Sequence, residues 1–441
     1  MTTKSESEIL TRTGPGTPMG ELFRQYWIPA AKSSELVAGG DPVRLMLLGE
    51  RLIGFRSPGG RVGIMDHRCP HRCASLFFGR NEEAGLRCVY HGWQYDPDGA
   101  CVDMPNVPPE QDFKQKVSAK AYKTFERNGL VWVFMGDREN IPPEPLLECT
   151  LLGEDEHRLM FAQRECNYLQ ALEGDIDTSH FGFLHAGAVT LDQIDEDHPS
   201  RFTIADRQPG YHVSDTDWGT MYAAFRDGDP GRTYWRTAQF VFPFWTMPPD
   251  GLFDDHIIAR AWVPMDDTHT MFIHVSWTEN TQGLRTGRDG KPLPGLAVGM
   301  EHLPDTTDWF GRWRLAAHAG NDYRIDREAQ RTNSFTGITG IHLQDQAVTE
   351  SMGGIVDHEL EHLAPSDRMI TQTRRRLINA ARAWRDRGEI PPACRDPEVV
   401  LGARSGDFQG PAGQGWREAY DDRMAASVNP TGRLIQRAAA E

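Results

Sequence analysis

Long hydrophobic runs are absent from this sequence of 441 residues. No apolar stretch approaches the roughly 20 residues that a membrane-spanning helix requires. The first residues, MTTKSESEILTRTGPG, lack the basic-then-apolar layout of a secretory signal. We therefore expect a cytoplasmic protein that has no membrane partner.

Positive charge is also scarce, with 47 Lys and Arg against 63 Asp and Glu and a formal net charge of -16. Nucleic-acid binding depends on neutralising phosphates with basic side chains, so no nucleic-acid partner is expected. A dinucleotide fingerprint is missing as well, because the glycines of AGGDP and SPGG do not follow the strand-to-helix pattern that it needs. Any electrons drawn from a nicotinamide must come through another protein.

The sequence also lacks an even number of regularly spaced cysteines. The chain has seven cysteines, and four of them lie between Cys69 and Cys101. Such clustering excludes a secreted disulfide framework and, in a reducing compartment, favours a metal site. Two of the four, Cys73 and Cys101, could form a disulfide or be buried thiols, and a reducing compartment favours buried thiols.

The chain is globular in composition, with 39% hydrophobic and 25% charged residues. Short β-type runs between residues 43 and 135 predict a small antiparallel β domain, and the proline-rich IPPEPLLE that follows reads as a connection. We expect an α+β fold made of four parts: an N-terminal segment at 1–40 that packs on the larger domain, the β domain at 41–140, the larger domain at 141–400 and an irregular tail at 401–441.

Within the larger domain, aromatic and β-branched runs predict an antiparallel sheet that is flanked by helices. The strands are expected at 233–249, 256–265 and 269–277. Helical spacing is seen at 167–187, at 308–320 and at 367–388. The last of these helices is predicted to be capped by Ser366 and to end at Gly388, with two prolines following.

One Cys and one His occur on each of two loops, in Cys69-Pro-His71 and Cys88-Val-Tyr-His91. Two thiolates suit one iron of a cluster and two neutral imidazoles suit the other, which is the ligand set of a Rieske-type 2Fe-2S centre. A Cys2His2 zinc site is the alternative, although its usual spacing separates a cysteine pair from a histidine pair.

The segment CPHRCASLFFGRNEEAGLRCVYHGW, from 69 to 93, resembles the Rieske domain of ring-hydroxylating non-haem iron oxygenases. The resemblance implies that Cys69 and Cys88 bind one iron of the cluster and that His71 and His91 bind the other. It also implies an N-terminal antiparallel β Rieske domain and a C-terminal catalytic domain.

A second set of metal-binding side chains follows in Asp177-Thr-Ser-His180 and His185. Two imidazoles and one carboxylate on one face of an iron leave positions open for oxygen and substrate, as in non-haem Fe(II) oxygenases. Capping of an acidic helix end is the alternative explanation for these residues.

The segment IHLQDQAVTESMGGIVDHELEHL, from 341 to 363, resembles the carboxylate segment of phthalate-type oxygenases, and the resemblance implies that Asp345 completes a mononuclear Fe(II) site with His180 and His185. The competing residues in this segment are Asp357, Glu361, Glu350, His358 and His362. Glu173 and Asp175 are expected beside the iron rather than on it.

The same resemblance gives Asp177 the role of an electron bridge between the two metal centres. In the family this bridge crosses a subunit boundary, from His91 of one chain to Asp177 and His180 of its neighbour. The resemblance therefore implies a head-to-tail ring of identical subunits, either a trimer or a hexamer.

Arginines supply the candidate substrate contacts. Arg236 alternates with apolar neighbours on an expected strand, and Arg207 lies in IADRQPG; phthalate-type relatives use arginines in this region to hold a substrate carboxylate. The resemblance thus implies a terminal oxygenase that uses O2 and a separate NAD(P)H-dependent reductase, with or without a ferredoxin. Its substrate is expected to be a small carboxylated aromatic compound, which it hydroxylates or O-demethylates.

Two other functions stay open at this point. One is a Rieske electron carrier without catalysis, which needs only the first set of ligands. The other is a Rieske monooxygenase that acts on a non-aromatic substrate, because fold and metals do not separate the reactions of this family.

Overall fold

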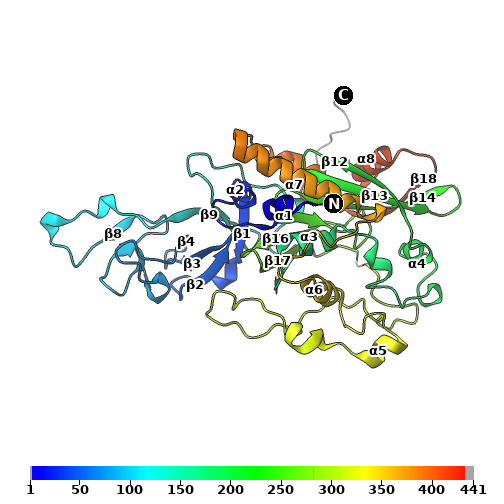
Figure 1. The fold of residues 1–441 in the computed structure, drawn as a ribbon, viewed down its shortest axis with the longest axis horizontal. Coiled ribbons are helices and arrows are strands. Elements are labelled where there is room, and N and C mark those ends of the chain that lie inside the picture. The colour runs from blue at the N-terminus through cyan, green and yellow to red at the C-terminus, as the bar shows by residue number, and fades with distance from the viewer. Residues whose placement is uncertain (1, 282, 433–441) are drawn as a thin grey trace.

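The computed structural model describes residues 2–281 and 283–432. Figure 1 shows an elongated molecule in which the strands of the N-terminal half extend to one side of a broader C-terminal half. Every strand pair in the ladders is antiparallel. The α+β fold, with an N-terminal β domain and a C-terminal antiparallel sheet flanked by helices, is confirmed.

The N-terminal half contains two sheets. The six-stranded sheet has the order β1-β10-β9-β4-β3-β2, and the four-stranded sheet has the order β5-β6-β7-β8. The strands are β1 (Trp27–Lys32), β2 (Val43–Leu47), β3 (Glu50–Arg56), β4 (Val62–Asp66), β5 (Arg80–Glu82), β6 (Gly85–Arg87), β7 (Gln94–Tyr95), β8 (Cys101–Asp103), β9 (Ala121–Arg127) and β10 (Leu130–Phe134).

The C-terminal half is built on an eight-stranded sheet. Seven of its strands follow the order β11-β17-β16-β15-β14-β13-β12, and the eighth, β18, pairs with β14. Its strands are β11 (His157–Arg164), β12 (Gly210–Asp215), β13 (Gly219–Asp227), β14 (Arg232–Val241), β15 (Trp245–Met247), β16 (Ile258–Pro264), β17 (Thr270–Trp277) and β18 (Gly406–Pro411). Every residue of β16 is buried, which matches its sequence IARAWVP, apolar except for Arg260.

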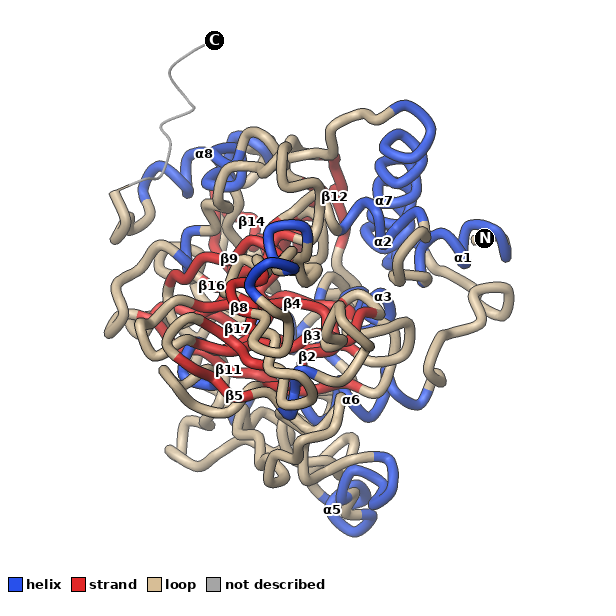
Figure 2. Tube along the Cα trace, turned by 90° about the vertical axis from the view of Figure 1, so that its left-hand side faces the viewer, coloured by secondary structure: helices blue, strands red, loops and turns tan. Residues whose placement is uncertain are grey.

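Within the described ranges, eight α-helices are present, and they lie around these sheets (Figure 2). They are α1 (Lys4–Thr11), α2 (Pro18–Phe23), α3 (Tyr168–Asp175), α4 (Arg201–Ala205), α5 (Arg327–Thr332), α6 (Ile341–Ser351), α7 (Arg368–Arg387) and α8 (Trp416–Ala426). Helices α1 and α2 pack against α7, whereas β1 belongs to the N-terminal sheet. Among the described residues, no helix is both long and apolar enough to cross a bilayer.

One continuous core joins the two halves of the molecule. Trp132 of β10 stacks on Trp245 of β15 with ring centroids 5.9 Å apart. Both side chains are among the largest that are fully buried. This packing holds the N-terminal sheet against the larger one, while the domain boundaries near residues 40, 140 and 400 stay predictions.

Two predicted elements are wrong. Residues 308–320 are not helical, because the backbone pairs with the preceding segment: Leu303 N donates to Arg314 O and Ala316 N to Glu301 O. The tail is not irregular throughout, since β18 and α8 both lie in it. Phe408 of β18 is buried beside β14, so the sheet gains an edge strand from a glycine-rich segment that lacks an obvious strand pattern.

Two other helices differ in detail from the prediction. The expected helix at 167–187 ends at Asp175, because Asp177 accepts a hydrogen bond from Ser179 N, and such local bonds compete with the helix. Helix α7 begins after Asp367 rather than at a Ser366 cap, and no side-chain cap bond is present. Its end at Gly388 is confirmed: this residue has φ 64° and donates its N–H to the last turn.

Candidate active site

Two loops of the N-terminal domain repeat the same backbone arrangement. In the first, Cys69 N donates to Ala74 O and Cys73 N donates to Cys69 O; in the second, Cys88 N donates to Trp93 O and Gly92 N to Cys88 O. The fifth residue of each loop has a positive φ, 58° at Cys73 and 80° at Gly92. Each cysteine is thereby held at the start of a tight turn that also carries a histidine.

The two turns bring the predicted cluster ligands together. Cys69 and Cys88 are both buried. Burial raises the pKa of the Cys88 thiol, and the nearby Cys69 raises it further. The rings of His71 and His91 lie 4.4 Å apart. His71 also stacks on Trp93, with centroids 4.3 Å apart and planes 9° from parallel.

The donor set fits a Rieske cluster. Nδ1 of His91 is buried and has no hydrogen-bond partner among the described residues, as expected for a nitrogen that faces a metal. Two thiols and two imidazoles on paired loops match one iron bound by sulfur and one bound by nitrogen. The alternative of a Cys2His2 zinc site is therefore not needed to explain these four residues.

The other two cysteines of this region differ from each other. Cys101 is buried as predicted, whereas Cys73 is exposed, so the prediction of a buried thiol at Cys73 is wrong. Cys73 occupies the positive-φ position of its turn, which turns its side chain away from the core that contains Cys69. All seven cysteines are free.

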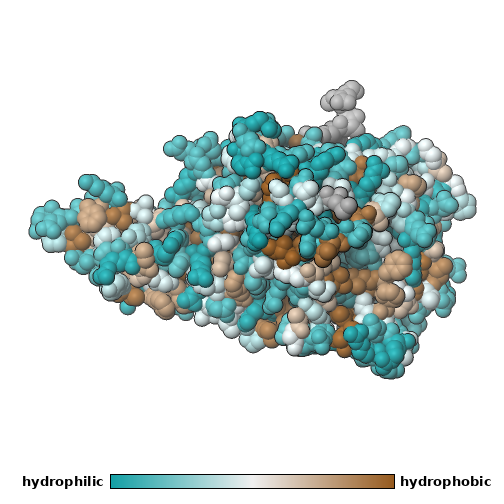
Figure 3. All heavy atoms as spheres, viewed as in Figure 1, coloured by the Kyte–Doolittle hydropathy of each residue, from teal (hydrophilic) through white to brown (hydrophobic). Residues whose placement is uncertain are grey.

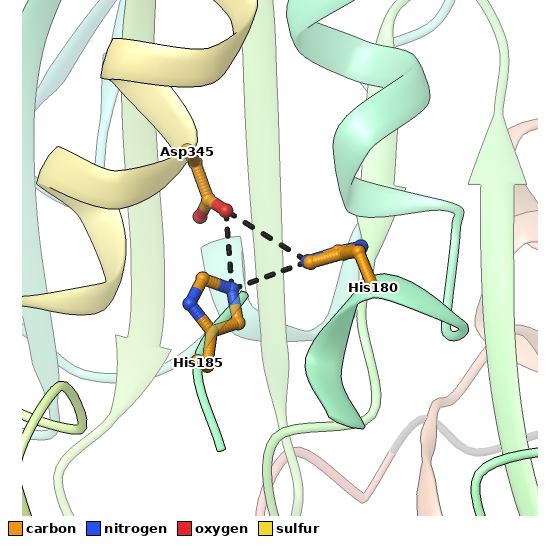
Figure 4. Close-up of side chains that lie close together, drawn as sticks. All are labelled: His180, His185 and Asp345. Carbon is orange, nitrogen blue, oxygen red and sulfur yellow. Dashed lines mark hydrogen bonds and ion pairs between the residues drawn. The ribbon is translucent and has the colours of Figure 1, made fainter. Parts of the chain in front are cut away.

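In the C-terminal domain, His180, His185 and Asp345 converge on one point (Figure 4). Nε2 of His185 lies 3.1 Å from Nε2 of His180 and 3.1 Å from Oδ1 of Asp345, and Nε2 of His180 lies 3.7 Å from the same oxygen. The histidines come from the irregular segment after α3, and Asp345 comes from α6. Two imidazoles and one carboxylate at this spacing fit a mononuclear iron with open positions.

The far nitrogens of both histidines are also held. Nδ1 of His180 lies 3.4 Å from Oδ2 of Asp177, and Nδ1 of His185 lies 2.6 Å from Oε1 of Gln344. The Gln344 amide in turn donates to Gly295 O and Ile338 O, which fixes its oxygen toward His185. These contacts leave both Nε2 atoms free to face the triad.

Gln344 was not predicted from the sequence. Its position directly before Asp345 is the only signal in the sequence. That signal is weak, because adjacent residues of a helix point to different sides. The bond to His185 needs the folded loop around residue 185, which no local pattern indicates.

The competing carboxylates are engaged in other contacts, whereas Asp175, which was expected beside the iron, lines a cavity together with the triad. Asp175 accepts from Arg260 at 2.5 Å and from Thr246 at 2.6 Å. Glu350 accepts from Tyr323 and Gln346. Asp357 accepts from Glu359 N, and the exposed His362 ring meets Leu360 O.

A second His and acid cluster contains Glu173, His358 and Glu361. Arg374 of α7 binds both carboxylates, with Nε to Glu173 Oε1 at 2.6 Å and Nη1 to Glu361 Oε2 at 2.6 Å. The guanidinium thus takes the position between the carboxylates that a cation would take, and it joins α7 to α3.

The triad opens on a cavity that Arg236, Arg260, Phe181 and Ile341 also line. The predicted substrate arginines are placed differently. Arg236 is buried, donates to Pro249 O at 2.7 Å and lies 3.5 Å from Asp407. Arg207 does not line this cavity; it lies over the Phe183 ring and donates to Gly187 O at 3.4 Å.

Two family models match the chain: the Rieske [2Fe-2S] domain over residues 26–125 and the LigXa C-terminal domain like model over residues 133–426. The 3-chlorobenzoate-3,4-dioxygenase oxygenase subunit of Comamonas testosteroni is 49% identical over 97% of this chain and 100% of its own length. The phthalate 4,5-dioxygenase oxygenase subunit of Pseudomonas putida is 36% identical over 87% of each chain.

A solved structure shares the fold. The NdmA QL mutant of Pseudomonas putida CBB5, determined with caffeine, aligns with a TM-score of 0.56 and 19% identity over 86% of this chain and 96% of that one. The predicted family and cofactors are confirmed. This chain belongs to the Rieske non-haem iron oxygenases, as the oxygenase subunit of a multicomponent system with a Rieske 2Fe-2S cluster and a mononuclear iron.

Proposed function

We propose that this oxygenase hydroxylates or O-demethylates a small aromatic carboxylate, with O2 as co-substrate and electrons from a separate NAD(P)H-dependent reductase. The observation that carries the proposal is the convergence of His180, His185 and Asp345 beside a cavity lined by arginines. Relatives that act on 3-chlorobenzoate and phthalate support the substrate class. Local arginines offset the net negative charge of the chain, which would otherwise repel an anion.

The proposed ligands are His180, His185 and Asp345 for the iron and Cys69, Cys88, His71 and His91 for the cluster. When bound, the cluster supplies single electrons and the iron activates O2. The chain's own residues orient these groups: Gln344 holds the tautomer of His185, and Asp177 holds that of His180. Phe181 and Ile341 supply apolar surface beside the triad, which limits water there.

A substrate carboxylate would be held by arginine. Arg236 lines the triad cavity and remains a proposed contact, with its Nε buried and without a partner among the described residues. The position of Arg207 outside the lining of this cavity favours Arg236 of the two.

We further propose that electrons reach the iron from a neighbouring subunit, through His91 of one chain and Asp177 of the next, in a head-to-tail trimer or hexamer. Strand β8 lies at the far end of the molecule from α6, which carries Asp345 (Figure 1). Hydrophobic residues are visible on the surface at that narrow end (Figure 3). Val89 and Tyr90, which lie between Cys88 and His91, are exposed, as is Phe78. Such exposure is typical of a surface that meets another protein.

The proposal is tested by product analysis under 18O2. Anaerobically purified protein is reduced chemically, mixed with 3-chlorobenzoate or phthalate, and then exposed to labelled oxygen. Incorporation of one or two 18O atoms into the aromatic product, or release of a demethylated product from a methoxybenzoate, is expected. If all these acids are unchanged while iron and sulfide are present at three and two per chain, the proposed substrate class is wrong.

A further inference from the structure

A second cavity of about 350 Å³ adjoins the triad cavity, and the two share Asp250 and Arg260 in their linings. It lies against β16 and β17, and His342 reaches it from α6, one turn before Asp345. Its lining also contains His274, Arg158 and Arg285. The space is large enough for a substituted benzene ring beside the proposed iron.

The lining of this cavity is rich in hydrogen-bond donors and positive charge. Three arginines and three histidines line it, against one carboxylate, Asp250. Asp250 is bound by Arg285 at 2.6 Å. Arg158 is exposed at the edge of the cavity and has no ion-pair partner among the described residues, so its positive charge there suits an anionic ligand.

The tautomer of His274 follows from its neighbour. Nε of Arg260 lies 3.2 Å from Nδ1 of His274, and a guanidinium nitrogen can only donate. Nδ1 of His274 must therefore accept, which places the ring proton on Nε2. Burial, followed by the charge of Arg260, lowers the pKa of His274 to about 3, so the ring is neutral and the assignment holds at neutral pH.

Arg260 is itself fixed in place. Its Nη1 donates to Asp175 at 2.5 Å, and Asp175 also accepts from Thr246, whose hydroxyl receives the Trp262 indole N–H. This chain of bonds runs from the end of α3 to His274 and holds the imidazole rigidly. No protein group among the described residues accepts from Nε2 of His274, whose half-buried ring lines the cavity.

We propose that His274 is a substrate-binding residue whose Nε2–H donates a hydrogen bond to a carboxylate oxygen of the aromatic substrate, with Arg260 as the residue that positions it. The inference rests on the proposed function. This donor takes its acceptor from outside the chain, and the arginines that line the cavity favour a carboxylate oxygen there over water. Arg236 is a weaker anchor, because Pro249 and Asp407 already engage both of its terminal nitrogens.

The test uses His274→Leu, which removes the donor, and His274→Gln, whose amide nitrogen can replace Nε2. His362→Leu is the matched control, since it makes the same substitution at an exposed histidine that lines neither cavity. Affinity for 3-chlorobenzoate is measured by calorimetry on anaerobic holoprotein, without turnover. A hydrogen bond to a charged group predicts a loss of about 10- to 100-fold for His274→Leu. His274→Gln and His362→Leu should stay within about threefold of the wild type.

The outcomes separate the two proposals. If the wild type binds 3-chlorobenzoate and His274→Leu binds it equally well, the His274 assignment is wrong and the proposed function stands. If the wild type binds no aromatic acid, the proposed function fails first. Should His274→Leu lose its Rieske absorbance, a crystal structure of the wild type with 3-chlorobenzoate decides: a carboxylate outside hydrogen-bonding distance of Nε2 overturns the assignment.

Discussion

At the scale of single residues, the iron site depends on groups that do not touch the proposed metal. Gln344 accepts from Nδ1 of His185 at 2.6 Å and is held by two backbone carbonyls. Partners of this kind fix the ring and raise its basicity as a ligand. Their loss should therefore weaken iron binding without removing a ligand.

We expect Gln344→Leu to lower iron affinity about 10- to 100-fold, because the His185 ring loses its acceptor. Gln372→Leu makes the same substitution on α7, where the amide only donates to Asp215, and should retain iron. Iron content after dialysis against a graded series of chelator concentrations measures the difference. Equal retention in both variants would show that the contact does not support the site.

His180→Ala should remove the mononuclear iron and abolish turnover, while the Rieske absorbance and two irons per chain remain. His358→Ala is the control, since His358 belongs to the cluster that Arg374 already occupies. That variant should keep three irons per chain. Iron analysis with electron paramagnetic resonance of the reduced protein reads both centres; loss of iron in the control instead would place the metal at the Glu173, His358 and Glu361 cluster and contradict the proposed site.

The sequence predicted these residues to different degrees. Cys69, His71, Cys88 and His91 are predicted well, since each pair belongs to one turn and the spacing is itself the signal. Asp345 is 160 residues beyond His185, so only a family resemblance connects them. Gln344 escaped prediction because its role depends on where a distant loop folds.

At the scale of elements, the end of α7 offers a clean test of backbone conformation. Gly388 has φ 64°, and a Cβ added there would meet nothing within 4 Å. Gly388→Ala should cost about 1 kcal/mol of unfolding free energy, because the left-handed conformation disfavours a side chain.

Gly299 serves as the control, since it also has open space around it and no positive φ. Gly299→Ala should stay within about 0.5 kcal/mol of the wild type. Urea unfolding followed by circular dichroism compares the variants. An equal effect at both positions would exclude backbone strain as the cause.

The elements that were predicted wrongly share one physical reason. Residues 308–320 carry helical spacing, but their carbonyls and amides bond to residues 301–306 and to Gln163 of β11. Strand β18 has glycine at both its first and fifth positions and is a strand only because β14 offers it a free edge. Tertiary pairing overrides local preference in both cases. By contrast, strands such as β16 and β17 are apolar enough to be recognised alone.

At the scale of the whole molecule, the proposed electron transfer from His91 of one chain to Asp177 of the next would make assembly part of the activity. A mixture of His91→Ala and His180→Ala chains tests this, since each variant lacks a different centre. In co-expressed rings, roughly a quarter of the head-to-tail junctions would join an intact cluster to an intact triad. We expect measurable turnover from the mixture and none from either variant alone; an inactive mixture of properly assembled rings would contradict transfer between subunits.

The exposed Cys73 provides a practical handle on that assembly. Six of the seven cysteines are buried, so a maleimide-linked spin label or fluorophore should attach at Cys73 first. The label would stand four residues from Cys69, on the loop that carries His71. Distances between labels on successive subunits would then report how closely one chain's cluster loop approaches the next, directly in solution.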